Sequence, residues 1–364
     1  MTFSNSLLHW YDENRRAMPW RGEKDPYKIW VSEIILQQTR VNQGWEYYLR
    51  FIEAFPNVKA LAEASQEQVL KIWQGLGYYS RARNMHEAAK TILSQHHGIF
   101  PTHYEEIRAL KGIGDYTAAA IASMAFDLPY PAVDGNLFRI VCRIDGIFDD
   151  IQLSSTKRLI TQKCDKLMKG CLPGDFNQAM MDFGALQCTP KNPKCDTCPF
   201  QSNCYAYRTG TIDALPVKTK KIVMKERYLH YFFFIAKEKT ILRQRTGKDI
   251  WEGLFDFPMI EATSATSDEV VQYLSKYQHN GNSYWQTKHQ LTHQIIHAFF
   301  YFIPLQKLPS LQKGEITVKF KDIPSYPFPK IFVEFLFGGI QHANFVHSAT
   351  YSPSPLSRKI VSEI

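Results

Sequence analysis

Four cysteines crowded into seventeen residues constrain this chain more than any other feature. They are spaced C-x6-C-x2-C-x5-C, at Cys188, Cys195, Cys198 and Cys204. Thiolates bunched this closely need a cation or an oxidant to hold them together. The segment also contains turn-forming residues at Pro190, Asn192, Pro193 and Pro199. We therefore expect a loop wrapped around a ligand rather than a helix.

Three kinds of site compete for this spacing. Disulfides are not expected, because the opening MTFSNSLLHWYDENRR lacks a signal-peptide core and so indicates a reducing compartment. Structural zinc usually takes two close cysteine pairs, whereas this loop has one, Cys195 and Cys198. Four cysteines in one short loop are typical of a cubane iron–sulfur cluster. Spacing therefore favours a [4Fe–4S] cluster and leaves zinc as the alternative. Cys142, Cys164 and Cys171 are interpreted as small buried hydrophobic residues.

The change in composition and periodicity along the chain predicts two domains. Residues 1–207 show apolar residues at helical spacing between glycine and proline turns. Residues 208–226 are polar, basic and aperiodic, which is typical of a linker. Residues 227–342 have the aromatic and β-branched runs of strands, and residues 343–364 have the polar, proline-dotted composition of a flexible tail. Within the third region we expect strands at 228–236, 295–304 and 316–320, and helices at 267–277 and 328–336.

The net charge and the hydropathy of the chain limit the kinds of molecule that it can bind. The net charge of +8 is shared equally by the two sides of residue 224, so any surface for a polyanion must be a patch made by folding. No apolar stretch reaches the roughly 18 residues that span a bilayer. We expect a soluble, cytoplasmic protein with no membrane partner.

Two acidic residues stand in unusual surroundings. Glu33 lies in the nearly all-apolar segment IWVSEIILQQTRV, either on an exposed helix face or as a desolvated carboxyl with a raised pKa. Asp134 precedes an amphipathic helix in PAVDGNLFRIVCRI. An aspartate there is usually an N-cap, but the positive helix end also suits a catalytic anion.

A glycine turn lies between the two acids, in LKGIGDYTAAAI. Gly112 and Gly114 feed the N-terminus of an alanine-rich helix, within a helix-hairpin-helix predicted at about 105–126. Bare N–H groups at a helix N-terminus bind phosphate well, although an ordinary corner between two helices can use the same turn.

Taken together, the Gly-Ile-Gly hairpin, the Val-Asp-Gly-Asn segment and the cysteine loop resemble the helix-hairpin-helix DNA glycosylases that carry a [4Fe–4S] cluster. The finer resemblance is to the MutY-type adenine DNA glycosylases, through MPWR, WVSEIILQQT and GLGYYSRARN. It implies a mainly α catalytic part followed by a Nudix-like α+β domain. It also implies removal of adenine paired with 8-oxoguanine or guanine in double-stranded DNA, by a monomer acting at the bacterial nucleoid.

The resemblance implies a role for each matching residue. Glu33 would protonate N7 of adenine, Asp134 would stabilise the cationic sugar, and Asn136 would position acid and water. Tyr116 stands where the lyase branch of this fold has a Schiff-base lysine, so a monofunctional enzyme is expected. The residues implied in DNA contact are Gln38 and Tyr78 as wedges, Gly112 and Gly114 at phosphate, and Thr292 and His293 in the recognition loop.

The C-terminal part resembles the MutY recognition domain but lacks the glutamate-rich box of Nudix hydrolases, so no pyrophosphatase activity is expected. Its loop Leu291-Thr292-His293 stands where the family often has Phe-Ser-His. His289, His293 and His297 are spaced as a helical metal site, but the strand-like residues after Ile295 argue against one. The rival functions are an endonuclease III-like lyase and a non-catalytic DNA-binding iron–sulfur protein.

Overall fold

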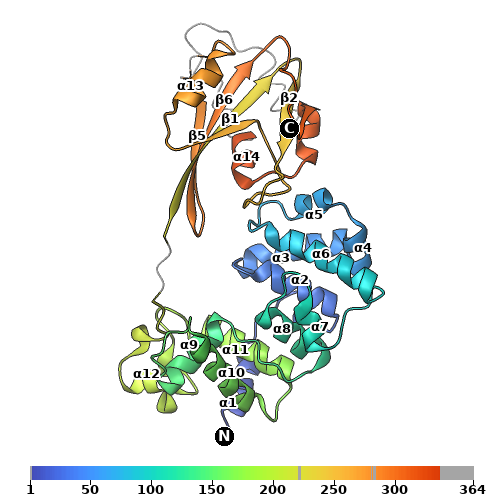
Figure 1. Cartoon of the computed structure of the whole chain (residues 1–364). Coiled ribbons are helices and arrows are strands. Elements are labelled where there is room, and N and C mark those ends of the chain that lie inside the picture. Colours follow the sequence, from blue (N-terminus) through green and yellow to red (C-terminus); the bar gives the residue numbers. More distant parts are fainter. Residues whose placement is uncertain (1, 220–222, 280, 282–283, 337–364) are drawn as a thin grey trace. The chain divides into compact units, whose positions relative to one another are not determined.

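A computed structural model describes residues 2–219, 223–279, 281 and 284–336. The chain forms two compact units (Figure 1). The helical unit comprises Met1–Glu63 and Asn84–Lys220, and the sheet unit comprises Ala64–Arg83 and Lys221–Ile364. The domain boundaries expected at residues 207, 226 and 342 remain predictions. Residues 337–342 and the tail expected at 343–364 lie outside the described residues.

The helical unit is built from short helices joined by tight turns. They are α1 (Phe3–Asn14), α2 (Pro26–Leu36), α3 (Val41–Ala54), α4 (Val58–Glu63), α6 (Ser80–Gln95), α7 (Tyr104–Ala109), α8 (Asp115–Phe126), α9 (Gly135–Asp145), α10 (Ser154–Met168), α11 (Pro173–Leu186) and α12 (Tyr205–Arg208), with 3-10 turns η1 (Cys195–Thr197), η2 (Gln201–Asn203) and η3 (Ile212–Ala214). The first residues of α6 belong to the sheet unit. No helix in the described part of the chain is both long enough and apolar enough to span a bilayer.

Helix α2 lies at the centre of this unit and is buried along nearly its whole length. It begins where the Asp25 side chain accepts a hydrogen bond from the Tyr27 N–H, with Pro26 in the first turn, as is usual for a helix start. It packs against α3 and α8. A helix that is apolar on all sides needs cover on all sides, and this burial brings Glu33 inside the protein.

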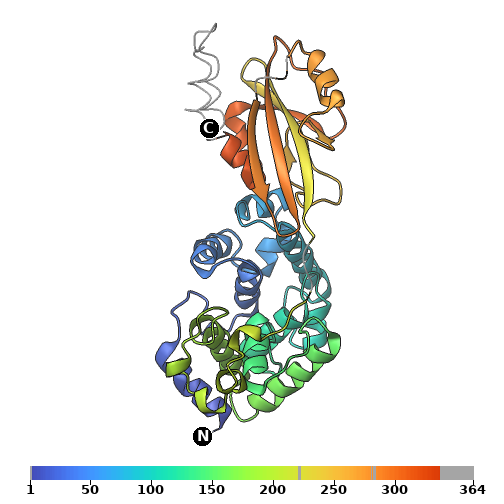
Figure 2. The ribbon, with the colours of Figure 1, turned by 90° about the vertical axis from the view of Figure 1, so that its left-hand side faces the viewer.

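A second apolar core joins α1, α9, α10 and α11 beside the cysteine loop. Helix α9 ends at Gly146, whose φ of +68° suits a glycine C-cap. Helices α9 and α11 approach closely at Gly184, where an added Cβ would lie 2.4 Å from the Cβ of Asn136. The elements are seen from a second direction in Figure 2.

The sheet unit contains a four-stranded sheet of order β4-β1-β6-β5 and a three-stranded sheet of order β3-β2-β7. The strands are β1 (Lys225–Ile235), β2 (Lys239–Gln244), β3 (Phe255–Asp256), β4 (Met259–Ala262), β5 (Tyr284–Gln290), β6 (Gln294–Pro304) and β7 (Glu315–Lys319), accompanied by α5 (Gln66–Ile72), α13 (Asp268–Ser275), η4 (Phe320–Ser325) and α14 (Lys330–Glu334). Strands β1 and β6 run parallel at the centre, and β5 and β6 form an antiparallel hairpin.

Alternation along β1 buries both faces of the larger sheet. Phe232 and Phe234 pack in the cluster that contains Val270 and Leu274 of α13. Tyr231 points to the other face and meets Phe332 of α14. Successive side chains of a strand point to opposite faces, so the continuous aromatic run of β1 fills two layers at once.

The predicted fold class is confirmed, and so are the predicted elements. The three strands expected from composition correspond to β1, β6 and β7, and the two helices to α13 and α14. His289 lies on β5 and His297 on β6, with His293 in the turn between them. The three histidines therefore do not lie on one helix.

The close approach of α9 and α11 leaves no room for a side chain at Gly184. We expect Gly184→Ala to destabilise the helical unit by about 1–3 kcal/mol, because the new methyl group overlaps a Cβ that cannot rotate away. Urea-induced loss of helical circular dichroism measures this. Gly135→Ala is the matched control on α9, since nothing lies within 4 Å of its added Cβ. Equal midpoints for the two variants would contradict the packing argument.

Candidate active site and iron–sulfur loop

Glu33 is 7% exposed and lines a cavity of about 280 Å³ in the helical unit. Burial raises the pKa of its carboxyl to about 7. The hydrogen bond from the Tyr116 hydroxyl to Glu33 Oε2, at 2.7 Å, opposes that rise, and the nearby charge of Asp134 adds to it. Of the two alternatives for Glu33, the exposed helix face is wrong. Its carboxyl is desolvated, which favours the protonated form.

Asp134 lines the same cavity but is bonded differently. It caps α9, its Oδ1 accepting from the N–H groups of Asn136 and Leu137 at 2.8 and 3.0 Å. Its Oδ2 accepts from Asn136 Nδ2 at 2.7 Å. The pKa of this carboxyl is raised above its usual value because burial outweighs the three hydrogen bonds, which lower it. Asp134 is thus an N-cap and also a cavity group. With three donors against the single donor of Glu33, it is the acid better suited to remain ionised.

Asn136 is held in turn by Arg139, a residue that the sequence interpretation missed. Arg139 Nη2 donates to Asn136 Oδ1 at 2.8 Å and to the Gly184 carbonyl at 2.6 Å. Its Nε donates to the Cys188 carbonyl at 2.7 Å. An arginine one turn after the N-cap, among the apolar residues of an amphipathic helix, was the available signal. This chain of contacts connects the first cysteine of the loop to the carboxylate in the cavity.

A third carboxyl group in the cavity wall, that of Asp182, was also missed. Asp182 is completely buried and accepts hydrogen bonds from Arg16 at 2.6 Å and Arg21 at 2.9 Å. Arg21 also donates to Gln178 Oε1 at 2.6 Å. Arg21 belongs to the MPWR segment, so that motif supplies a polar wall. The cavity therefore offers fixed donors and acceptors that suit the edge of a planar polar ligand.

The residues expected to contact DNA fall into separate groups. Gln38 lines the Glu33 cavity and has a φ of +58°, a conformation that is uncommon for a residue with a side chain. Gly112 and Gly114 lie in the turn between α7 and α8. Gly112 has a φ of +80°, and an added Cβ would lie 2.6 Å from the Cβ of Asn84. Gly114 is the N-cap of α8 and has no side chain to cover its N–H groups.

Tyr78 and the recognition loop lie together in the sheet unit. The Tyr78 hydroxyl is hydrogen-bonded to the Thr292 hydroxyl. Tyr78, Thr292 and His293 line one wide cavity of about 1030 Å³, and Tyr78 also has a positive φ, of +47°. Two side chains expected to touch DNA are therefore in contact with each other.

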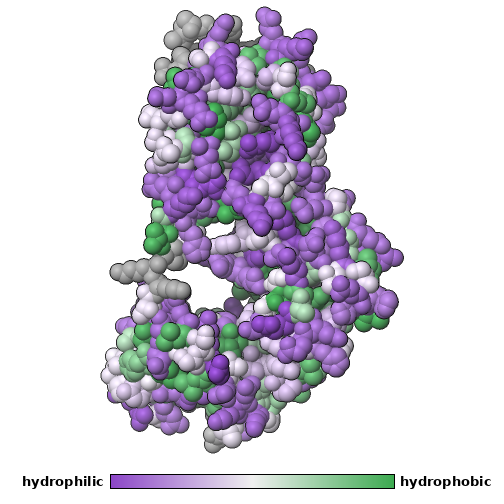
Figure 3. All heavy atoms as spheres, viewed as in Figure 1, coloured by the Kyte–Doolittle hydropathy of each residue, from purple (hydrophilic) through white to green (hydrophobic). Residues whose placement is uncertain are grey.

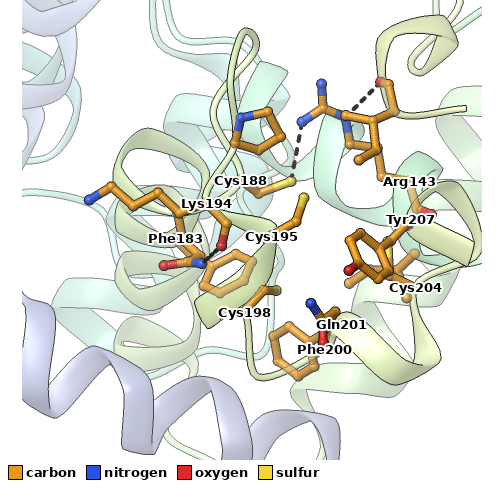
Figure 4. Close-up of a pocket in the computed structure, with 14 residues that line it drawn as sticks. Arg143, Phe183, Cys188, Lys194, Cys195, Cys198, Phe200, Gln201, Cys204 and Tyr207 are labelled. Carbon is orange, nitrogen blue, oxygen red and sulfur yellow. Dashed lines mark hydrogen bonds between the residues drawn. The ribbon is translucent and has the colours of Figure 1, made fainter. Parts of the chain in front are cut away.

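The four loop cysteines line a single pocket (Figure 4). Its other walls include Ile144, Phe183 and Phe200. Burial raises the pKa of the Cys198 thiol to about 11, and burial followed by the charges of Cys188 and Cys204 raises that of Cys195. Thiols in such surroundings become ligands only when a cationic group supplies positive charge.

The geometry of the pocket distinguishes the two groups that the sequence left open. Among the described residues, no set of three or more Cys, His, Asp or Glu side chains is placed to hold a single metal ion. A tetrahedral zinc ion draws its four thiolates around one atom, whereas each thiolate of a [4Fe–4S] cluster binds a different iron. Four cysteines spread around an apolar pocket fit the cluster better than they fit zinc.

Comparison with known proteins agrees with this arrangement. Residues 31–169 match the family described as HhH-GPD superfamily base excision DNA repair protein. Residues 188–204 match the iron–sulfur binding domain of endonuclease III, and residues 230–336 match the NUDIX domain. A protein named adenine DNA glycosylase from Buchnera aphidicola subsp. Schizaphis graminum is 36% identical over 83% of this chain and 86% of its own. The chain belongs to the adenine DNA glycosylase family.

Other members of the family show the same likeness. The adenine DNA glycosylase of Buchnera aphidicola subsp. Baizongia pistaciae is 34% identical over 87% of this chain and 90% of its own. The mouse protein of that name is 41% identical over 59% of this chain and 44% of its own. Among solved structures, a thermostable thymine-DNA glycosylase matches with a TM-score of 0.52 and 28% identity, over 57% of this chain and 95% of its own. The cysteine loop of this family member is therefore an iron–sulfur loop, as predicted.

The face shown in Figure 3 is largely hydrophilic, with hydrophobic side chains gathered near α9 and α12. Phe148, which follows α9, and Tyr205, which begins α12, are exposed and meet edge to face at 6.1 Å. The iron–sulfur loop of this family member therefore adjoins an apolar surface as well as an apolar pocket.

The raised pKa of Glu33 makes stability depend on pH. Its folded pKa of about 7 exceeds the unfolded value of 4.5, so the folded state loses stability as pH rises from 4.5 to 7. Glu33→Gln removes this ionisation. We expect the variant to match the native protein near pH 4.5 and to be more stable above pH 7, by up to about 3 kcal/mol. Thermal unfolding at several pH values measures the difference. A difference that does not change with pH would contradict the assigned protonation.

Proposed function

We propose that this protein is a monofunctional DNA glycosylase that removes adenine mispaired with 8-oxoguanine, or with guanine, from double-stranded DNA. We further propose that it acts as a monomer at the nucleoid of a bacterial cell. One observation carries the proposal. Two carboxyl groups in different hydrogen-bonding environments face a single cavity, in a chain of the adenine DNA glycosylase family.

The role proposed for Glu33 is that of general acid. Adenine is a poor leaving group from deoxyribose, and protonation of its ring at N7 makes it a better one. A carboxyl that keeps its proton near neutral pH is therefore needed. The pKa of Glu33, raised to about 7 by burial, supports this role. The Tyr116 hydroxyl, 2.7 Å away, orients the carboxyl.

The role proposed for Asp134 is electrostatic. Cleavage of the glycosidic bond leaves positive charge on the sugar, and a fixed carboxylate next to it stabilises that charge. The hydrogen bonds from Asn136 and Leu137 would keep Asp134 ionised and in position. One acid at the leaving group and one carboxylate at the sugar is also the arrangement of glycoside hydrolases.

The absence of an amine at position 116 supports hydrolysis without strand cleavage. A lyase needs a nucleophilic amine that forms an imine with the sugar. Tyr116 carries a phenol whose pKa is raised well above its ordinary value by burial, and its hydroxyl donates to Glu33. Water, positioned with the help of Asn136, would be the nucleophile.

Binding requires that the adenine leave the duplex, which costs a few kcal/mol. We propose Gln38 and Tyr78 as the wedges that offset this cost by filling the stack, and the turn at Gly112 and Gly114 as a phosphate site. Arg21 and Asp182 in the cavity wall would hold the edge of the extruded base.

The decisive experiment measures base release from duplexes that have adenine opposite 8-oxoguanine, guanine, cytosine or thymine. We expect release opposite 8-oxoguanine and guanine only. Glu33→Gln should reduce the single-turnover rate by about 100-fold or more, because the general acid is lost. Duplex binding, measured by fluorescence anisotropy, should be largely unchanged.

Two controls accompany this assay. Glu53→Gln removes an exposed acid from α3 of the same unit and should keep full activity. Borohydride added to the protein with abasic DNA should trap no covalent adduct. Efficient trapping would favour the lyase alternative, and release that survives Glu33→Gln would rule out Glu33 as the acid.

Lesion preference tests the role proposed for Thr292. Thr292→Val keeps the side-chain shape but removes the hydroxyl that bonds Tyr78. We expect the preference for 8-oxoguanine over guanine to fall about 2- to 10-fold, as for one lost hydrogen bond. Thr292→Ser, which keeps the hydroxyl, is the matched control and should retain the preference. Equal ratios in both variants would exclude this hydroxyl from lesion recognition.

A further inference from the structure

Arg143 lies on α9 one turn beyond Arg139 and is 3% exposed. Its guanidinium makes five contacts, three with the start of the cysteine loop and two with the segment that follows the loop. At the start of the loop, Nη1 donates to the Thr189 carbonyl at 2.7 Å and Nη2 to the Pro190 carbonyl at 3.1 Å. Past the end of the loop, Nε donates to the carbonyls of Ile212 and Leu215 at 3.2 and 3.1 Å.

The fifth contact reaches a ligand atom. Arg143 Nη1 lies 3.5 Å from Cys188 Sγ, in the orientation drawn in Figure 4. The backbone of the same residue meets the other end of the loop, because Cys204 Sγ lies 3.4 Å from the Arg143 carbonyl oxygen. The first and the fourth cysteine are thus both in contact with Arg143.

We propose that Arg143 is the positioning residue of the iron–sulfur site, where it joins the two ends of the cysteine loop and supplies positive charge to the Cys188 sulfur. Two of its nitrogens donate to carbonyls at the start of the loop, and the third donates to two carbonyls beyond its end. The planar guanidinium is suited to this task and an ammonium is not. Hydrogen bonds to the sulfurs and the charge near them set the reduction potential of an iron–sulfur cluster. Arg143 would therefore govern both how firmly the cluster is retained and how readily it is reduced.

Two substitutions separate these effects. Arg143→Lys keeps the charge but loses the forked donor, and Arg143→Gln loses both. In both variants we expect iron release to a chelator to become about 10- to 100-fold faster, as for other residues that hold metal ligands in place. Release is followed by the decay of absorbance near 400 nm and by iron and sulfide content per chain.

The reduction potential distinguishes charge from geometry. It should fall in Arg143→Gln, because adding an electron next to the thiolates is harder without a nearby cation. It should stay close to the native value in Arg143→Lys. Arg208→Gln is the matched control, since it removes an exposed positive charge from α12 in the same region. That variant should leave release rate and potential unchanged.

Native release rates in both Arg143 variants would overturn the proposal. A potential equally lowered in Arg143→Lys and Arg143→Gln would overturn the charge role. If Arg143→Gln does not fold, Arg143→Lys decides alone: faster release supports the proposal and native release contradicts it. These readouts require no DNA and no base release, so they are independent of the proposed glycosylase activity.

Discussion

The burial of one carboxyl beside another is the main physical constraint on the cavity of the helical unit. Glu33 lies inside because α2 is apolar on every side, and burial raises its pKa to about 7. Asp134 faces the same cavity, where the N-terminus of α9 and the amide of Asn136 supply donors. Two acids in one low-dielectric cavity cannot both be ionised cheaply, and Asp134 has more hydrogen-bond donors to stabilise its charge than Glu33 has.

Hydrogen bonds connect this pair of carboxyl groups with the iron–sulfur loop. Arg139 connects Asn136 with the Cys188 carbonyl, and Arg143 connects both ends of the loop with α9. Each arginine is buried, and each directs its donors at acceptors on more than one segment of the chain. One helix therefore carries the cavity carboxylate at its start and the cluster supports along its length.

The sheet unit follows a different principle. Its strands are aromatic on both faces, so β1 and β6 fill two cores with stacked and edge-to-face rings. Residues Ala64–Arg83 belong to this unit, which places Tyr78 beside Thr292. The family resemblance implied that Tyr78 and Thr292 both contact DNA. No local pattern in the sequence indicated that the two side chains touch each other.

Local chemistry in the chain was enough for several conclusions. The cysteine spacing indicated the iron–sulfur loop, and the Asp before α9 indicated an N-cap. Runs of aromatic and β-branched residues indicated β1, β6 and β7. Each of these signals depends on neighbours in sequence. Tertiary packing alone decided the rest. Whether Glu33 is exposed or buried depends on α3 and α8, and the partners of Asp182, Arg139 and Arg143 lie on other elements. Protonation and long-range hydrogen bonding are set by three-dimensional surroundings, which spacing along a chain does not encode.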